Sequence, residues 1–361
     1  MEKPDKAPDA PLSSQEVAEL MKMGSWRLGR LAIPQIELLV SQVRTEPSRS
    51  FRVAIHPGLQ ISNAPTTRRS NARPSLTIAH YRTLSLTITH HHAPSPIRQI
   101  EAAVRDILPD VQPVNLDEAS TPFLYMDTMD IRNTHSMAHN LPDPEKSDPA
   151  WPRMQIENRV YESFCFRKLH IEVAVQQDGL QVLHCVMYPR NSFDVPILSL
   201  DMVAYNGRPT FAIVDPCPVS QDLSLPRVYA TSVMSLQQKY GVVTNSDIPE
   251  WGRNIFSDFC IQLRPESPEH VGRFLKYALA LVHFHLQFAR LALPVKSTDD
   301  ARGPGKEKTR EIHESHARFS ANQLRNDKTR QILEKRFGAD TAREYMERMM
   351  FDVEPFPPGR S

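Results

Sequence analysis

Two histidines and two carboxylic acids lie in strand-like segments, where they could donate and accept protons. Residues 168–175 alternate apolar and polar side chains, which places His170 and Glu172 side by side on one face of a strand. His184 lies among apolar residues of the next segment, and Asp201 is the only charged residue of the segment after that. Ionisable groups are costly to bury without partners. The pattern therefore indicates a site for general acid–base chemistry.

The turn at Asp178-Gly179 decides whether these residues can share a site. A two-residue turn would send Glu172 and His184 to opposite faces of the sheet. A three-residue turn over 177–179, with Gly179 in a left-handed conformation, would place Glu172 directly opposite His184. We favour the three-residue turn and expect the two side chains to be neighbours.

Asp201 is expected in a strand over 197–204, which returns through an Asn206-Gly207 turn as a strand over 210–214. A carboxyl group that is desolvated in such a strand has a raised pKa and keeps its proton near neutral pH. We therefore expect Asp201 to be a buried general acid. The alternative is a structural role, because a single polar residue on a strand face is often simply solvated and a core histidine is often only hydrogen-bonded.

Helix periodicity and cap residues predict helices before and after these strands. We expect helices over 97–108, over 267–293, over about 311–337 and over 340–350, with a flexible loop at 296–310. Strands that are followed by helices predict an α+β fold with a largely antiparallel sheet whose faces the helices cover.

The helix over 311–337 carries polar residues on its apolar stripe. The stripe through Phe319, Leu333 and Phe337 passes over Gln323 and Asn326, with Asp327 at its margin. Buried polar side chains need partners, and a polar ligand would supply them. The alternative is a helix face that meets water at this point.

Composition excludes several other functions. The chain has 361 residues and a net charge of +1, so no global field attracts nucleic acid or an anionic membrane. The apolar segment 274–294 is interrupted by charges, and no membrane span is predicted. The four cysteines lack metal or cluster spacing, and no metal site is expected. Nucleotide-binding motifs are also missing, so a redox role would need electrons from outside the chain.

The first 96 residues differ in composition from the rest. Residues 47–96 contain no Asp or Glu but many Ser, Thr, Arg and Pro, which is typical of organelle transit peptides. A disordered extension is the alternative. We expect residues 97–361 to form a single domain.

Several motifs appear in an order that resembles the ferredoxin-dependent bilin reductases. They are Phe166-Arg-Lys-Leu-His170-Ile-Glu172, Leu183-His184-Cys-Val-Met-Tyr-Pro189, Asp201 in its apolar strand, Pro249-Glu-Trp-Gly252, Ile255-Phe-Ser-Asp-Phe-Cys260, Arg264-Pro265, Asn326-Asp-Lys-Thr-Arg330 and Phe351-Asp352. The resemblance covers roughly residues 155–352, more weakly back to residue 97, and is strongest to the members that make phycocyanobilin.

This resemblance implies a three-layer α/β/α sandwich that holds a bilin between the sheet and the C-terminal helices. It implies a four-electron reduction of biliverdin IXα to phycocyanobilin, with reduced ferredoxin as the external electron donor and no bound cofactor. The transit-peptide composition of the N-terminal segment then predicts a plastid enzyme, and we expect a monomer. The alternatives are a related reductase that makes phytochromobilin or phycoerythrobilin, and a bilin carrier or lyase without turnover.

The resemblance also assigns residues. Asp201 and His184 match the pair that hydrogen-bonds and protonates the tetrapyrrole, Glu172 the proton donor to the D-ring vinyl group, and His170 its support. On the helix side, the residues expected to bind the substrate are Gln323, Asn326, Asp327 and Lys328, with Lys328 matching a propionate anchor.

Overall fold

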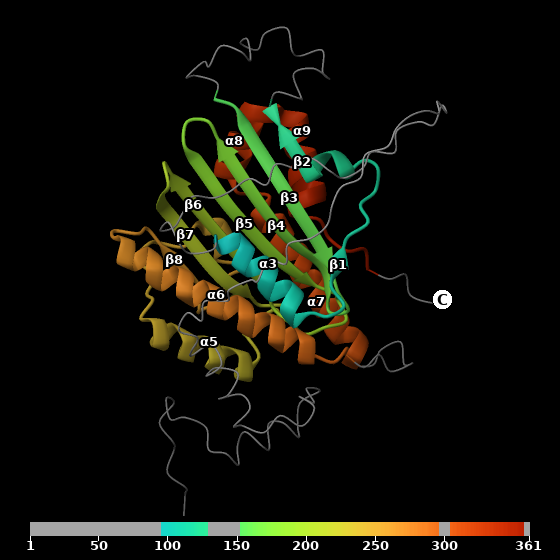
Figure 1. The fold of residues 1–361 in the computed structure, drawn as a ribbon. Helices are drawn as coiled ribbons and strands as arrows, with labels where there is room; N and C mark the ends of the chain where they lie inside the picture. Colours follow the sequence, from blue (N-terminus) through green and yellow to red (C-terminus); the bar gives the residue numbers. More distant parts are fainter. Residues whose placement is uncertain (1–94, 129–151, 296–303, 357–361) are drawn as a thin grey trace, which may run out of the picture.

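The computed structural model describes residues 95–128, 152–295 and 304–356 (Figure 1). One antiparallel sheet of eight strands runs through these ranges in the order β1-β3-β4-β5-β6-β7-β8, with β2 also pairing with β3. The strands are β1 (Gln112–Pro113), β2 (Tyr125–Asp127), β3 (Met154–Glu162), β4 (Phe166–Gln176), β5 (Leu180–Pro189), β6 (Ile197–Tyr205), β7 (Arg208–Cys217) and β8 (Ile261–Leu263).

The hairpin between β4 and β5 has the three-residue turn that the sequence predicts. Gly179 has φ +99° and its backbone N–H donates to the carbonyl of Gln176 over 3.0 Å. A Cβ at this position would lie 2.0 Å from the side-chain oxygen of Asn206, so a larger residue would have to displace that side chain as well as adopt a backbone conformation that favours glycine. This turn fixes the register, in which Glu172 pairs with His184.

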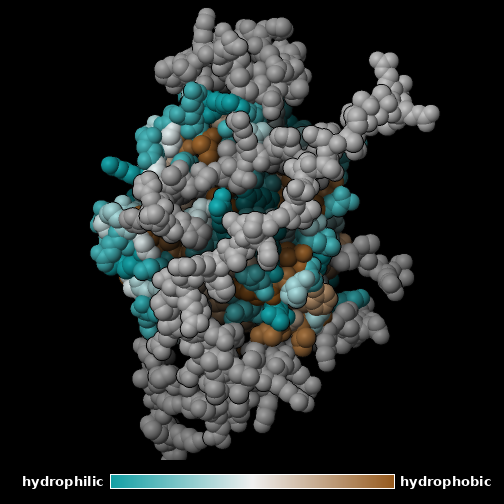
Figure 2. Space-filling view, in the orientation of Figure 1, coloured by the Kyte–Doolittle hydropathy of each residue, from teal (hydrophilic) through white to brown (hydrophobic). Residues whose placement is uncertain are grey.

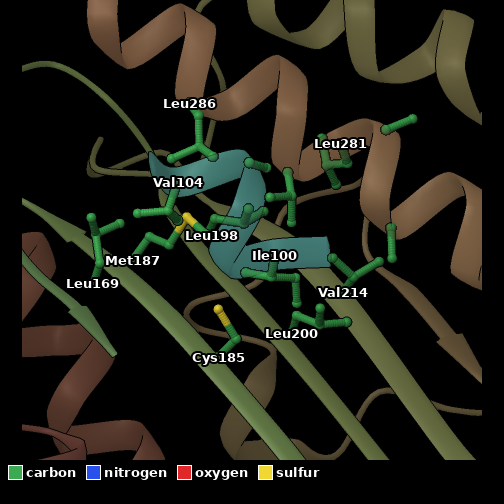
Figure 3. Close-up of a cluster of buried hydrophobic side chains, with 14 of the residues drawn as sticks. Ile100, Val104, Leu169, Cys185, Met187, Leu198, Leu200, Val214, Leu281 and Leu286 are labelled. Atoms are coloured by element: carbon green, nitrogen blue, oxygen red, sulfur yellow. The ribbon is translucent and has the colours of Figure 1, made fainter. Parts of the chain in front are cut away.

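One face of the sheet is covered by α3 (Pro96–Ile107) and α6 (Pro268–Leu291), which lie in front of the strands in Figure 1, and α5 (Arg227–Tyr240) packs beside α6. Figure 3 shows part of the buried cluster between these helices and the sheet, in which Ile100 of α3 lies beside Leu200 of β6. Each large apolar side chain buried in this way stabilises the fold by roughly 1.5–3 kcal/mol. Ser267 caps α6 by accepting the N–H of His270, as expected for this sequence.

The other face is covered by α7 (Pro304–Gln323), α8 (Asp327–Phe337), α9 (Ala339–Glu344) and the π-helical turn η4 (Tyr345–Met350). Buried side chains of this layer include Phe319, Leu333 and Phe337, which pack with Ala174 and Val186 of the sheet. The described chain therefore has the α+β, three-layer arrangement that we expected. Two short 3₁₀ turns, η1 (Thr121–Leu124) and η3 (Glu250–Gly252), complete the described elements.

The C-terminal helices differ from the prediction in two respects. The prediction of a loop over 296–310 is wrong from Pro304 onward, because α7 begins there. Pro304 and Gly305 are compatible with a helix at this point because they occupy its first turn, where backbone N–H groups have no partner within the helix. The single helix over 311–337 is also wrong. Asn326 has an extended backbone with ψ 90° and interrupts the helical conformation, so α7 ends at Gln323 and α8 begins at Asp327. The segment 296–303 lies outside the described residues.

The sequence prediction also missed α5. Its buried residues Tyr229, Ser232, Val233 and Leu236 have helical spacing, and Gly241 ends the helix with φ +59°. Both signals are present in the sequence.

Among the helices of the described ranges, none combines the length and hydropathy that a membrane-spanning helix needs. In the orientation of Figure 1, Figure 2 shows hydrophilic side chains (teal) interspersed with hydrophobic areas (brown) where coloured atoms are visible. The proposed transit segment, residues 1–96, lies almost entirely outside the described residues.

Candidate active site

The strands align four polar side chains in one row across the sheet. The antiparallel register pairs Asn158 with Glu172, Glu172 with His184, and His184 with Asp201. Paired residues of neighbouring strands project from the same face. The row therefore lies on the face that α7, α8, α9 and η4 cover, and His170 lies on that face two residues before Glu172.

His184 is paired with Asp201 at one end of this row. The ring Nδ1 of His184 lies 2.5 Å from Oδ1 of Asp201. Burial opposes the charged imidazolium, but the charge and the hydrogen bond of Asp201, together with the charge of Glu172, raise the pKa of His184 above its ordinary value. The position of Asp201 therefore favours the protonated imidazole of His184, whose Nδ1–H donates to the carboxylate.

The expectation of a buried Asp201 is wrong, because its side chain keeps 28% of its exposure. The covering side chains explain the difference. Tyr345 covers Asn158 and Glu172, and the ring of Phe351 lies 5.7 Å from that of His184, whereas Asp201 comes one strand further along the row. Asp201 is therefore the member of the row that water or a ligand can reach.

Glu172 is the deeply buried carboxyl group of the row, with 4% exposure. Burial raises its pKa, although the charge of His184 acts in the opposite direction, as does a Tyr345 hydroxyl when it donates to the carboxylate form. The Tyr345 hydroxyl lies 2.7 Å from Oε2 of Glu172. A carboxyl group in this environment can keep a proton at neutral pH and act as a general acid.

His170 is fully buried and neutral. Its Nε2 lies 2.7 Å from Oδ1 of Asn158, an atom that only accepts, so Nε2 carries the hydrogen. Burial, followed by the charges of His184 and Lys168, lowers the pKa of His170 well below the ordinary histidine value. The other nitrogen, Nδ1, is therefore a bare acceptor.

Two ring nitrogens of this site have no hydrogen-bond partner among the described residues, although both are buried. They are Nδ1 of His170 and Nε2 of His184, on rings whose centroids lie 5.6 Å apart. Buried polar atoms are rarely left unpaired in folded proteins. The first can accept a hydrogen bond and the second, in the imidazolium, can donate one. A ligand with both functions would complete the site.

The helix-side residues differ in how far they are buried. Gln323, at the end of α7, is 3% exposed, and Asn326 is half-buried at the break before α8. Asp327 and Lys328 are exposed, and Asp327 forms an ion pair with Arg330 one turn further along α8. The break between α7 and α8 therefore separates the buried amide of Gln323 from the charged residues at the start of α8.

Sequence analysis missed Tyr345 and Asn158 as members of the site. Tyr345 is 173 residues from Glu172 in the sequence, and no local pattern links them. The sequence does contain a signal for Asn158, because it takes the place of an apolar residue between Ile156 and Val160 on the apolar face of an alternating strand.

An ion-pair cluster fixes the C-terminal segment to the start of β4. Asp352 accepts from Arg167 Nη1 over 2.7 Å and also forms an ion pair with Lys168. Lys168 donates to the carbonyl of Met349 as well, over 3.0 Å. Because η4 lies directly before this cluster, these contacts hold Tyr345 and Phe351 over the row.

Comparisons with known proteins agree with this geometry. A family model described as "Ferredoxin-dependent bilin reductase" matches residues 126–352. A phycocyanobilin:ferredoxin oxidoreductase of a Synechococcus species is 39% identical over 203 residues, which are 56% of this chain and 77% of the relative. A protein of the same name from Trichodesmium erythraeum is 36% identical over 200 residues, covering 55% and 77% of the two chains.

Among solved structures, phytochromobilin synthase from tomato, crystallised in complex with biliverdin, superposes with a TM-score of 0.54 at 15% identity. The superposition covers 71% of this chain and 83% of the tomato chain, and it shows a shared fold. The family match spans more than half of the sequence, and the relatives are matched over 77% of their length. The chain therefore belongs to the ferredoxin-dependent bilin reductases.

Proposed function

We propose that this chain reduces biliverdin IXα to phycocyanobilin, taking four electrons from reduced ferredoxin and four protons from its own side chains and water. Two relatives at 36% and 39% identity carry the name of this reaction. The observation that carries the proposal is the row of Glu172, His184 and Asp201, because electron transfer from ferredoxin brings no protons and the protein has to provide positioned acids.

Each member of the row has a distinct proposed role. Asp201 and His184 share a proton and donate it to the tetrapyrrole as each electron makes the bilin more basic. Glu172 donates to the D-ring vinyl group, and His170 supports this step from the same sheet face. The partial exposure of Asp201 favours its direct contact with the bilin, and the burial of Glu172 favours its neutral acid form.

The helix side of the site binds the substrate in this proposal. Gln323, Asn326 and Asp327 line the bilin, and the ammonium group of Lys328 binds a propionate. The exposure of Lys328 suits this role, since propionates are charged and stay near water. Electrons arrive singly from outside, so bilin radicals occur between the proton transfers. We propose that the chain acts as a monomer with no bound cofactor of its own.

An anaerobic assay tests the reaction. The purified chain receives biliverdin IXα, ferredoxin, ferredoxin reductase and NADPH, and the bilins are separated by chromatography. Phycocyanobilin is the expected product, and no reduction is expected when ferredoxin is omitted. Phytochromobilin or phycoerythrobilin would favour the alternative reductases. Tight biliverdin binding without turnover would favour a carrier or lyase and would refute the proposed activity.

A plastid location belongs to the same proposal, because residues 47–96 have the acid-poor, Ser- and Arg-rich composition of transit peptides. Residues 1–96 fused to a fluorescent protein should accumulate in plastids and be cleaved there. Diffuse fluorescence throughout the cell would contradict import.

A further inference from the structure

The hydroxyl group of Tyr345 lies between two acceptor groups but has only one proton. Its oxygen is 2.7 Å from Oε2 of Glu172 and 2.9 Å from Oδ1 of Asn158. Tyr345 is fully buried, and Asn158 and Glu172 are nearly so, so water cannot easily replace a missing hydrogen bond. The positions of the protons therefore follow from which atoms can donate.

The orientation of the Asn158 amide is fixed by its other contact. Its Nδ2 donates to the carbonyl oxygen of Phe123 over 2.6 Å. If the amide were turned over, Oδ1 would face this carbonyl and two acceptors would be in contact. Oδ1 therefore points into the site, where it accepts from Nε2 of His170 on one side and faces Tyr345 on the other.

Two proton arrangements remain for Glu172. If Glu172 is a carboxylate, Tyr345 donates to it, and the oxygens of Tyr345 and Asn158 face each other over 2.9 Å without a proton. If Glu172 is a neutral acid, it donates to Tyr345, which in turn donates to Asn158. Only the neutral acid satisfies every short contact of the network.

We propose that Tyr345 and Asn158 are positioning residues that hold Glu172 in the site as a neutral acid, with its proton resting on the Tyr345 side until a substrate takes it. They do so through a chain of hydrogen bonds from Glu172 to Tyr345 to Asn158, while Asn158 also keeps the hydrogen of His170 on Nε2. The same contact leaves Nδ1 of His170 free to accept from a ligand.

The hydroxyl group also responds when the acid loses its proton. When the acid O–H of Glu172 turns from Tyr345 to the substrate and transfers its proton, the Tyr345 O–H turns from Asn158 to the new carboxylate and forms a charge-assisted hydrogen bond. This step rests on the proposed function, in which Glu172 is the donor to the D-ring. The other ionisable groups that face Glu172 act in opposite directions: His184 favours the carboxylate, whereas the charge of Asp201 favours the acid.

Infrared spectroscopy of the substrate-free protein tests the proton position without any turnover. The difference spectrum between wild type and Glu172→Gln at pH 7 should contain the C=O stretch of a protonated carboxyl group. A carboxylate signal alone would overturn the proposal, and this measurement does not require a Tyr345 variant to fold.

Tyr345→Phe then tests whether the Tyr345 hydroxyl accepts the Glu172 proton. Without an acceptor for its proton, the Glu172 acid should show its C=O stretch at a higher frequency. Tyr188→Phe is the matched control: it removes another buried hydroxyl of the same core cluster, one that donates to the carbonyl of Met350 and does not contact Glu172, and it should leave the band unchanged. A band that stays in place in Tyr345→Phe would remove Tyr345 from the network.

Turnover provides an independent readout. Tyr345→Phe should lower kcat by about tenfold or more with little change in biliverdin Kd, because the acid is less well aimed and its carboxylate is less stabilised. If the chain proves inactive on biliverdin, the infrared result still decides where the proton lies. Failure of the proposed function is thereby distinguishable from failure of this inference.

Discussion

Glu172 and His184 lie directly opposite each other in the β4–β5 hairpin, so a buried acid and a protonatable imidazole share one short stretch of sheet. They are only 12 residues apart in the sequence, and the turn at Gly179 sets the strand register that pairs them. A one-residue change in that turn would move every side chain of β5 to the other face. The turn therefore determines the chemistry of the site as well as the fold.

Replacement of Asp201 by Asn should leave biliverdin binding largely intact and reduce turnover on the order of a hundredfold or more. The amide keeps the shape and can still hydrogen-bond to Nδ1 of His184, but it cannot share or donate a proton. The measurement compares kcat and biliverdin Kd with those of wild type. Asp340→Asn, which changes an exposed aspartate of α9, serves as control. Near-normal turnover of Asp201→Asn would return this aspartate to a structural role.

Glu172→Gln should divert the reaction and not simply slow it. The variant keeps the pocket volume but has no acid for the D-ring vinyl group, so reduction should continue on the A-ring side. A product with an intact 18-vinyl group should accumulate, which chromatography and mass spectrometry would identify. Unchanged formation of phycocyanobilin by this variant would exclude Glu172 from the proton path.

The His184–Asp201 pair should make stability depend on pH. Because the folded protein raises the pKa of His184, the stabilising effect of the pair is fully present below the unfolded pKa of about 6.5 and is lost as pH rises through the higher folded value. The free energy of unfolding of wild type should exceed that of Asp201→Asn by about 1–2 kcal/mol near pH 5.5, less than for a fully buried pair because Asp201 stays 28% exposed.

Urea denaturation at several pH values measures this difference. It should shrink above pH ~7–8, as the imidazole loses its proton. In a His184→Gln background, Asp201→Asn should change the stability by an amount that does not vary over this range. A difference between wild type and Asp201→Asn that grows with pH would show that the sign of the linkage is wrong.

The ion-pair cluster at Asp352 should contribute strongly to stability. Asp352→Asn leaves Arg167 and Lys168 without their counter-charge, although their side chains are only 8% and 7% exposed. We expect a loss of about 2–4 kcal/mol in the free energy of unfolding, somewhat below the value for a fully buried pair since Asp352 itself is 35% exposed. Asp340→Asn breaks the exposed pair with Arg343 and should cost well under about 1 kcal/mol. Equal effects of the two substitutions would argue against a role of the cluster in docking the C-terminal segment.

The register of the strands that carry Glu172 and His184 could be predicted from the sequence because strand alternation and turn geometry are local. The period of two in 168–175 and the positive φ of Gly179 were sufficient to bring Glu172 opposite His184. The exposure of Asp201 could not be obtained in the same way, because it depends on which helix covers which strand. Likewise, Tyr345 reaches Glu172 only through tertiary packing, which no local spacing encodes.

The helix side was predicted less well for a related reason. The apolar stripe of residues 311–337 continues in phase across the α7–α8 break, and the change of direction depends on the backbone of the single residue Asn326. Periodicity reports which face of a helix is apolar, but it does not report where the chain changes direction.

The π-helical turn Tyr345–Met350 joins two contacts that would otherwise be unrelated. At its start Tyr345 closes the buried row over Glu172, and just after its end Asp352 neutralises the cations at the beginning of β4. A π-helical turn contains one residue more than an α-helical turn, so deleting one residue within it would rotate one contact out of place relative to the other. The last helical turn of the described residues thus sets the spacing between these two contacts, and the burial of Glu172 depends on a segment of only eight residues, 345–352.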